Sequence, residues 1–197
     1  TQVVMAVRPD FPARNFEELV ALSKKRSLSY GTPGAGTSPH LVGEYLSTIS
    51  PLQSLHVPYK GTAPAVNDAM GGQIDLVFDA GVSLPSVRAG KLKLLAVAGS
   101  ARLPEFPDVG TLAEAGLGGF DSDTTFVLMT PAGTPKPIVD RVNAEVVKLL
   151  RSDEFATRLR TMNLSAVANS PTEARTNLSD DHFRLGEVIK DAGVKLE

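Results

Sequence analysis

The sequence has 197 residues, a formal net charge of −2 and no cysteine. This length allows one large domain or two small ones, and a charge near zero without a long Lys/Arg run argues against nucleic acid as a partner. The absence of cysteine excludes disulfides, thiol catalysis and cysteine metal sites, and the longest apolar stretch, residues 92–98, is too short to span a bilayer.

Strand and helix patterns alternate along the first part of the chain. Asn15 with Glu18 forms a predicted capping box that opens a first helix at Phe16. Thr111 with Glu114 forms another predicted capping box. Strand, helix, strand, helix at short spacing predicts an α/β fold with a mainly parallel sheet covered on both faces. The expected strands cover residues 1–7, 28–31, 52–57, 74–78 and 93–98, and further helices cover residues 39–48, 62–71 (capped by Thr62) and 83–89.

The pattern changes after Gly119. Residues 124–129 have the character of a single strand, residues 164–168 show a weaker strand pattern, and helices dominate the remainder. Thr134, Ser152 and a Ser170–Glu173 capping box mark the starts of helices that reach about residues 151, 161 and 190. The final Leu196-Glu197 pair fits either the native end of the protein or the start of a purification-tag linker.

A glycine-rich loop between residues 31 and 38 is the most informative local feature. Ser38 is the predicted N-cap of the next helix, with Pro39 at its first position. Free backbone N–H groups at a helix start form an anion site that needs no cationic side chain. The hydroxyls of Thr32, Thr37 and Ser38 are further donors for a carboxylate. An ordinary strand-to-helix turn explains the same pattern, and the loop alone leaves both interpretations open.

Other polar residues each have a functional and a structural interpretation. His40, at the second position of the helix after the loop, is explained locally by capping and packing; His56 is favoured as structural, and His182 as solvent-exposed. The three histidines are well separated and predict no metal site. Asp79 ends a parallel strand, where open α/β sheets place their ligands, but it could equally cap the following turn. Tyr59 offers its hydroxyl to a ligand or packs in the core, whereas Asp75, Lys60 and Lys91 are favoured as structural or surface residues.

Catalytic motifs are weak in this sequence. Ser38 has no evident His–Asp relay and no Gly-x-Ser-x-Gly elbow occurs, which disfavours a hydrolase. Gly34-x-Gly36 lacks the third glycine and the downstream acid of a dinucleotide fingerprint, and no phosphate-loop lysine follows. The sequence therefore predicts neither a cofactor nor an enzyme.

A series of motifs follows the glycine loop at regular positions. They are YGTPGAGTSPH at 30–40, HVPYKGTAPA at 56–65, GGQIDLVFD at 71–79, AGKLKLLAV at 89–97, PDVGT at 107–111, EAG at 114–116, TPAGTP at 130–135 and VIKDAGVK at 188–195. In order and spacing this series resembles the extracytoplasmic solute receptors of tripartite tricarboxylate transporters, the Bug family. Gly110 stands where that family usually has proline, and Leu185 where it usually has tryptophan. A tryptophan expected before residue 130 is also absent.

The resemblance implies a type II periplasmic-binding-protein fold. Residues 9–121 would be one complete doubly wound lobe, and residues 1–8 and 122–197 part of a second lobe, with hinge crossings at 3–7 and near 120–126. The family's signal peptide and amino-terminal strand, Pro-Gly-Gly turn and helix have no counterpart before Thr1, so the chain is expected to lack roughly the first third of such a receptor. The apolar faces of residues 122–197 are then expected either to pair with a second copy of the chain, or to pack on the remaining segment where that segment is present outside the given sequence.

The resemblance also implies a function. Two lobes would close over a small mono-, di- or tricarboxylate in the periplasm and present it to the membrane subunits of the transporter. Ordered waters would bridge part of the ligand. The expected ligand-binding residues are Thr32, Gly34, Ala35, Gly36, Thr37, Ser38, His40, Tyr59 and Asp79, with no metal and no cofactor. For His40 the resemblance implies either a role in ordering the loop or a water-mediated contact with the ligand.

Two alternatives remain at this point. The effector-binding domain of a transcription regulator shares the two-lobe architecture, and it would need an amino-terminal helix-turn-helix. A small α/β enzyme acting on a carboxylic acid is less favoured, because no nucleophile–base pair stands out. Neighbouring genes for one large and one small membrane protein would favour the receptor over both.

Overall fold

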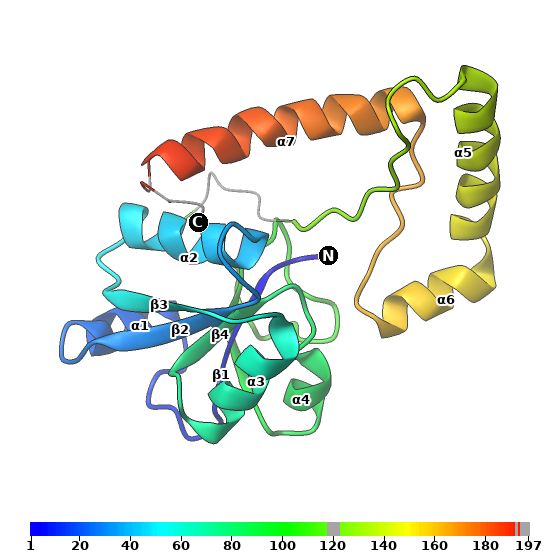
Figure 1. Cartoon of the computed structure of the whole chain (residues 1–197). Coiled ribbons are helices and arrows are strands. Elements are labelled where there is room, and N and C mark those ends of the chain that lie inside the picture. The colour runs from blue at the N-terminus through cyan, green and yellow to red at the C-terminus, as the bar shows by residue number, and fades with distance from the viewer. Residues whose placement is uncertain (118–122, 192, 194–197) are drawn as a thin grey trace. The chain divides into compact units, whose positions relative to one another are not determined.

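The computed structural model describes residues 1–117, 123–191 and 193 (Figure 1). Residues 120–122 of the expected hinge crossing and the Leu196-Glu197 pair lie outside the described residues. The chain divides into two compact units, one of Gln2–Thr124 with Val188–Glu197 and one of Thr1 with Thr125–Glu187.

The larger unit contains a five-stranded sheet in the order β3-β2-β4-β1-β5. Strand β2 runs parallel to β3 and β4, whereas β1 is antiparallel to both of its neighbours, β4 and β5. The predicted α/β fold with a mainly parallel sheet is confirmed, with one reversed strand inside it. The strands are β1 (Val4–Val7), β2 (Leu28–Thr32), β3 (Ser54–Pro58), β4 (Leu76–Asp79) and β5 (Lys93–Val97).

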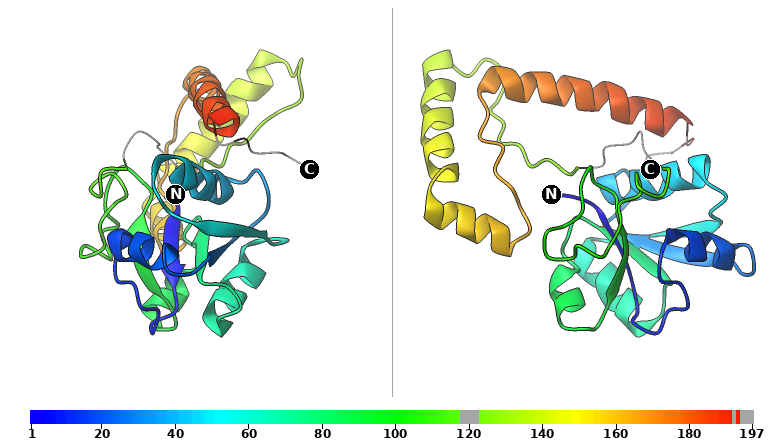
Figure 2. Two further views of the ribbon diagram at one scale, coloured as in Figure 1. Left: turned by 90° about the vertical axis from the view of Figure 1, so that its left-hand side faces the viewer. Right: turned by 180° about the vertical axis from the view of Figure 1, so that it is seen from behind.

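Helices cover both faces of this sheet, as Figures 1 and 2 show. Successive residues of a strand point to opposite faces. Met5 and Val7 of β1 therefore pack in the cluster that includes α1 (Phe16–Ser23) and α2 (Ser38–Ile49). Val4 and Ala6 pack in the cluster that includes α3 (Thr62–Gly71) and α4 (Leu84–Arg88). The sheet is doubly wound, and all four residues are fully or almost fully buried.

Helix starts in this unit agree with the sequence in part. Asn15 caps α1 by accepting a hydrogen bond from the Glu18 backbone N–H, as predicted. The predicted caps Ser38 and Thr62 are wrong by one residue: Thr37 and Gly61 are the N-caps, and neither makes a side-chain capping bond. Thr111 and Glu114 form both hydrogen bonds of a capping box. The residues after them form only turns, because Gly116, at φ 80°, leaves the helical conformation directly after a single i→i−4 bond from the Ala115 N–H to the Thr111 carbonyl.

The smaller unit is helical. Helices α5 (Lys136–Leu150), α6 (Asp153–Thr161) and α7 (Pro171–Asp191) confirm the three predicted helices, and α7 belongs to this unit up to Glu187. Ser152 accepts from the Phe155 N–H, and Ser170 with Glu173 caps α7. Thr134 is not the cap of α5, because it donates to the Pro131 carbonyl and Pro135 takes the cap position. The strands predicted at 124–129 and 164–168 do not form; these residues are irregular.

The length and polarity of a helix decide whether it can span a membrane. Among the described residues, the helices are all too short or too polar to serve as a transmembrane span.

We expect the chain to self-associate through the smaller unit. No side chain of α5 is buried among the described residues, and Ile138 and Leu149 are 52% and 50% exposed. Contiguous exposed apolar surface of this kind drives association. Light scattering should therefore show a mass that rises with protein concentration, and Ile138→Glu with Leu149→Glu should abolish the rise. A concentration-independent monomer would contradict this expectation.

Candidate functional site

The carboxyl ends of three parallel strands define one edge of the sheet. Chain order and spatial order differ here: β2 connects through α2 to β3 on one side, and β3 connects back through α3 to β4 on the other. The helices that follow β2 and β4 lie on opposite faces. The ends of β2 and β4 therefore flank a topological switch point, where open α/β sheets bind their ligands. The glycine loop, residues 32–37, begins at the end of β2.

Backbone hydrogen bonds fix the base of the glycine loop. The Tyr59 N–H donates to the Thr32 carbonyl (3.1 Å) and the Gly61 N–H to the Pro33 carbonyl (2.9 Å). Gly36 has φ 74°, in the left-handed region that glycine adopts without strain. Ala35 and Gly36 are exposed at the tip of the loop. The loop is thus anchored at one end and open at the other.

The hydroxyls of the loop divide into two groups. Thr32 is fully buried and its Oγ1 lies 2.7 Å from His56 Nε2, while Thr37 Oγ1 donates to the Gly34 carbonyl at 2.8 Å. Both hydroxyls hold the loop together. Ser38 is half-buried at the first turn of α2, and among the described contacts its hydroxyl has no partner. Ser38 is therefore the hydroxyl of this set that remains free to donate to an anion.

Backbone N–H groups supply the other donors. The Gly36 N–H donates to His40 Nδ1 at 3.0 Å and so points into the protein. Within the described chain, the N–H groups of Ala35, Ser38 and His40 have no acceptor. Unpaired N–H groups at the start of a helix, together with the helix dipole, attract negative charge. The loop tip and the first turn of α2 can therefore hold one carboxylate.

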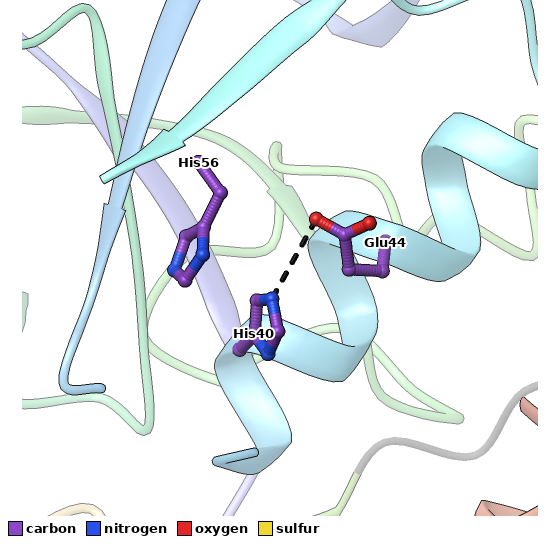
Figure 3. A group of neighbouring side chains, drawn as sticks. All are labelled: His40, Glu44 and His56. Atoms are coloured by element: carbon purple, nitrogen blue, oxygen red, sulfur yellow. Dashed lines mark ion pairs between the residues drawn. The ribbon is translucent and has the colours of Figure 1, made fainter. Parts of the chain in front are cut away.

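Two histidines that are distant in sequence meet beside this loop (Figure 3). The rings of His40 and His56 are stacked with centroids 4.0 Å apart, which corrects the expectation of three well-separated histidines. Figure 3 shows Glu44, one turn further along α2, facing His40, with 3.6 Å between its Oε1 and His40 Nε2. The Tyr30 hydroxyl donates to the same Glu44 oxygen. The His40–His56 cluster, as we call His40, Glu44, His56 and Tyr30, is a connected polar network.

Burial shifts the pKa values of this cluster. It lowers the pKa of His40, and together with the charge on His40 it lowers the pKa of His56 to about 4. Burial and the hydrogen bond to Glu44 raise the pKa of the Tyr30 hydroxyl. Both histidines are therefore neutral near pH 7. Because the Gly36 N–H donates to His40 Nδ1, the proton of the neutral ring is on Nε2, toward Glu44.

The same cluster meets the distance requirement for a metal site, since its His and Glu ligand atoms lie within 4.8 Å of one another. A metal-bound histidine normally donates its other ring N–H to a second group. His40 does the reverse, because its Nδ1 accepts from Gly36 and its Nε2 carries the proton. His56 Nε2 is already bonded to Thr32. The hydrogen bonds favour a structural network over a metal site.

We expect the stability of the chain to fall as the pH falls from 6.5 to 4. In the unfolded chain the histidines titrate near their ordinary pKa of 6.5, whereas in the folded chain these pKa values are lower. The unfolded state therefore binds protons first, and stability that is fully present above pH 6.5 is lost below it. The melting temperature of a His40→Asn/His56→Gln double variant should depend less on pH over this range. An equal loss in both proteins would contradict the expectation.

Three other candidate residues lie near the same sheet edge. The Tyr59 hydroxyl donates to Asp68 on α3 at 2.7 Å, and burial with this bond raises its pKa to about 12. Asp79 is fully buried and accepts from the Ser83 N–H at 3.0 Å, and burial raises its pKa. These contacts favour packing for Tyr59 and turn-capping for Asp79, and their ligand contacts remain predictions. Asp75 pairs with Arg26 at 2.7 Å and is structural.

Sequence reasoning missed Glu44 and the meeting of His40 with His56. A signal for the first was present, because Glu44 follows His40 by four residues and so lies on the same face of α2. The second depends on strand register, which pairs Tyr30 of β2 with His56 of β3. Nothing in the local sequence around His56 indicates that pairing.

Comparisons with known proteins bear on this site. The family model described as "Tripartite tricarboxylate transporter family receptor" matches residues 1–194. A protein of Pseudomonas sp. strain P51, described as a UPF0065 protein in the tcbD-tcbE intergenic region, is 33% identical over 172 residues, which are 85% of this chain and 51% of the relative. The chain thus spans about half the length of that curated relative.

Three solved structures are also similar. R. palustris Rpa4515 with adipate has a TM-score of 0.91 at 30% identity, over 98% of this chain and 66% of its own. The periplasmic binding protein BugD has a TM-score of 0.86 at 31% identity, over 100% and 67%. MatC from Rhodopseudomonas palustris with bound malate has a TM-score of 0.70 at 30% identity, over 98% and 66%. The matches cover nearly the whole of this chain and about two thirds of each structure.

Proposed function

Because this chain belongs to the receptor family of tripartite tricarboxylate transporters, we propose that it binds a small organic carboxylate in the periplasm and delivers it to the membrane subunits of such a transporter. The family consists of solute receptors rather than enzymes. Similar structures hold adipate and malate, both of which are dicarboxylates. The resemblance to the Bug family is confirmed by the family model and by the match to BugD.

The observation that carries this proposal is the set of free donors at the glycine loop. The N–H groups of Ala35, Ser38 and His40 and the Ser38 hydroxyl have no partner among the described residues. No arginine occurs between Arg26 and Arg88, so the loops at this sheet edge provide no guanidinium. A carboxylate bound here would be held by backbone N–H groups and the dipole of α2. Thr32, Gly34, Gly36 and Thr37 shape the loop around it.

We also propose a division into lobes. Residues 9–121 form one ligand-binding lobe, and residues 122–197 belong to a second lobe of the whole receptor. Residues 1–8, expected from the sequence to belong to the second lobe, contribute β1 to the sheet of the first. The match of this chain to about two thirds of each similar structure supports this division.

A matched pair of compounds tests carboxylate binding. Adipate and its uncharged diamide, adipamide, have the same length and differ in charge. Adipate should raise the melting temperature of the chain in proportion to the logarithm of its concentration above Kd, and adipamide should not. Malate and citrate added in parallel would rank di- against tricarboxylates. Equal shifts with adipate and adipamide, or no shift with any carboxylate, would contradict the proposal.

We expect no chemical turnover of a bound carboxylate. Ser38 is not hydrogen-bonded to a histidine, and His40 Nδ1 is occupied by the Gly36 N–H. A nucleophile without a base within hydrogen-bond reach is weak at neutral pH. NMR of adipate and malate with the protein over many hours should show unchanged spectra. The appearance of any product that depends on protein concentration would favour the alternative of a small α/β enzyme.

A further inference from the structure

We propose that His40 and His56, stacked as a neutral pair, are positioning residues that hold the glycine loop in its anion-binding conformation, and that protonation of His40 releases the loop. This proposal rests on the function proposed above for its link to ligand affinity. Its structural part concerns the loop alone. The two parts are therefore tested by different measurements.

The link from His40 to the loop is a single hydrogen bond. His40 lies in the first turn of α2 and is 6% exposed, and its Nδ1 accepts from the Gly36 N–H at 3.0 Å. This bond turns the Gly36 N–H inward and leaves the N–H groups of Ala35, Ser38 and His40 as the open donors. A proton on Nδ1 would face the Gly36 N–H with a second donor. The bond therefore exists only while Nδ1 is unprotonated.

His56 supports the loop from the other side. Its Nε2 shares a 2.7 Å hydrogen bond with Thr32 Oγ1, and Thr32 Oγ1 also lies 3.3 Å from the Gly34 carbonyl. The rings of His56 and His40 are stacked, with 4.0 Å between their centroids. His56 on β3 thus holds the first part of the loop, residues 32–34, and His40 on α2 holds Gly36.

The groups that face the pair set the cost of its protonation. Glu44 faces His40 from the next turn of α2, and Tyr30 of β2 stacks on His56 with centroids 5.0 Å apart and donates to Glu44. Glu44 favours a charged histidine, but burial of both rings opposes it and lowers both pKa values. A positive charge on one ring also disfavours a charge on the other. The pair is therefore neutral at neutral pH, and its protonation requires a pH below the ordinary histidine pKa.

Two substitutions separate the hydrogen bond from the titration. Asn carries its Oδ1 at the same number of bonds from Cβ as His Nδ1, so His40→Asn keeps an acceptor for Gly36 without a titrating group. His40→Leu removes the acceptor. His182, exposed on α7, provides a matched control through His182→Asn. All three variants change one histidine and leave the other two in place.

The first measurement follows the Gly36 amide and the histidine ring nitrogens by ¹⁵N NMR without ligand. At pH 7 the His40 ring should have an unprotonated Nδ1 and a protonated Nε2. The Gly36 amide should shift as the pH falls toward 4 in the wild type and in His182→Asn, but not in His40→Asn. In His40→Leu the Gly36 amide should have, at every pH, the chemical shift that the wild type reaches only at low pH. A protonated Nδ1 at pH 7, or a Gly36 amide that does not respond to His40→Leu, would overturn the proposal.

The second measurement is adipate affinity against pH. The ratio of wild-type to His40→Asn affinity cancels the titration of adipate itself. It should fall about tenfold per pH unit once His40 in the free protein is protonated, because one proton must leave for the ligand to bind. A constant ratio would overturn the link between the histidines and the ligand. Absence of adipate binding in every variant would instead overturn the proposed function. The NMR measurement would still decide whether His40 holds the conformation of the glycine loop.

Zinc provides a separate check on the cluster. Addition of Zn²⁺ at pH 7 should leave the Gly36 amide and the His40 ring signals unchanged. Saturable shifts of these signals at one equivalent of Zn²⁺ would show that the cluster is a metal site and would contradict the proposal.

Discussion

Replacement of Gly36 by valine should weaken adipate binding by about 10- to 100-fold. Gly36 has φ 74° at the exposed tip of the glycine loop, where a β-branched residue adds about 1–3 kcal/mol of backbone strain. Relief of that strain would move the loop and break the hydrogen bond from Gly36 to His40. The N–H groups of Ala35, Ser38 and His40 would then no longer point toward one carboxylate. Isothermal titration calorimetry measures the change in Kd directly.

Two control variants make this prediction specific. Gly90 has a similar φ of 70° beyond the end of α4, with no atom within 4 Å of an added Cβ, so Gly90→Val imposes similar strain away from the loop. Lys60→Ala removes an exposed cation near the same sheet edge. Both should leave adipate affinity within a few-fold of wild type. If Lys60→Ala weakened binding more than Gly36→Val, binding would depend on a cation rather than on the helix start.

The second large effect is expected at Gly43 in α2. A Cβ at this position would overlap the ring of Tyr30 and lie 2.8 Å from its hydroxyl. Tyr30 is fully buried and its hydroxyl is bonded to Glu44, so the ring has no free space into which to move. Overpacking of this kind costs about 1–3 kcal/mol. The helix propensity of alanine offsets about 0.5–1 kcal/mol of this cost. Gly43→Ala should therefore lower the free energy of unfolding by up to about 2 kcal/mol, measured by urea denaturation.

Gly71→Ala is the matched comparison. Gly71 ends α3, it does not have a positive φ, and an added Cβ there meets nothing within 4 Å. The same substitution should stabilise the chain by about 0.5–1 kcal/mol, because alanine has the higher helix propensity. The two variants should thus move stability in opposite directions. Destabilisation of equal size in both would show that Tyr30 is not the cause at Gly43.

Local signals predicted the helices better than the strands. The predicted Asn15–Glu18 and Ser170–Glu173 capping boxes involve residues three apart. The second forms both of its hydrogen bonds, whereas the first forms only the cap on Asn15, because the Glu18 carboxylate accepts from the Arg14 N–H. A strand needs partners that lie far away in sequence, and residues 124–129 remain irregular despite their strand-like composition. The reversed direction of β1 within the sheet follows from its pairing with β4 and β5. No pattern inside residues 1–7 indicates that direction.

In the candidate site too, local features were predictable from the sequence and contacts between distant residues were not. The glycine loop, the start of α2 and their place at the end of a parallel strand followed from local sequence. The allocation of donors did not, because it depends on His40 reaching back to Gly36 and on Thr32 meeting His56. These contacts join residues up to 24 positions apart. They remove the Thr32 hydroxyl and the Gly36 N–H from the predicted set of free donors, and the local bond from Thr37 to the Gly34 carbonyl removes the Thr37 hydroxyl. Ser38 and three backbone N–H groups are left.

The most direct test of carboxylate binding at the glycine loop is a titration of the ¹⁵N-labelled chain with adipate, followed amide by amide. The largest saturable shifts should occur together at Ala35, Ser38 and His40, with a single Kd, and adipamide should not produce them. Saturable shifts centred elsewhere on the chain, or shifts at these three amides that adipamide reproduces, would contradict this prediction.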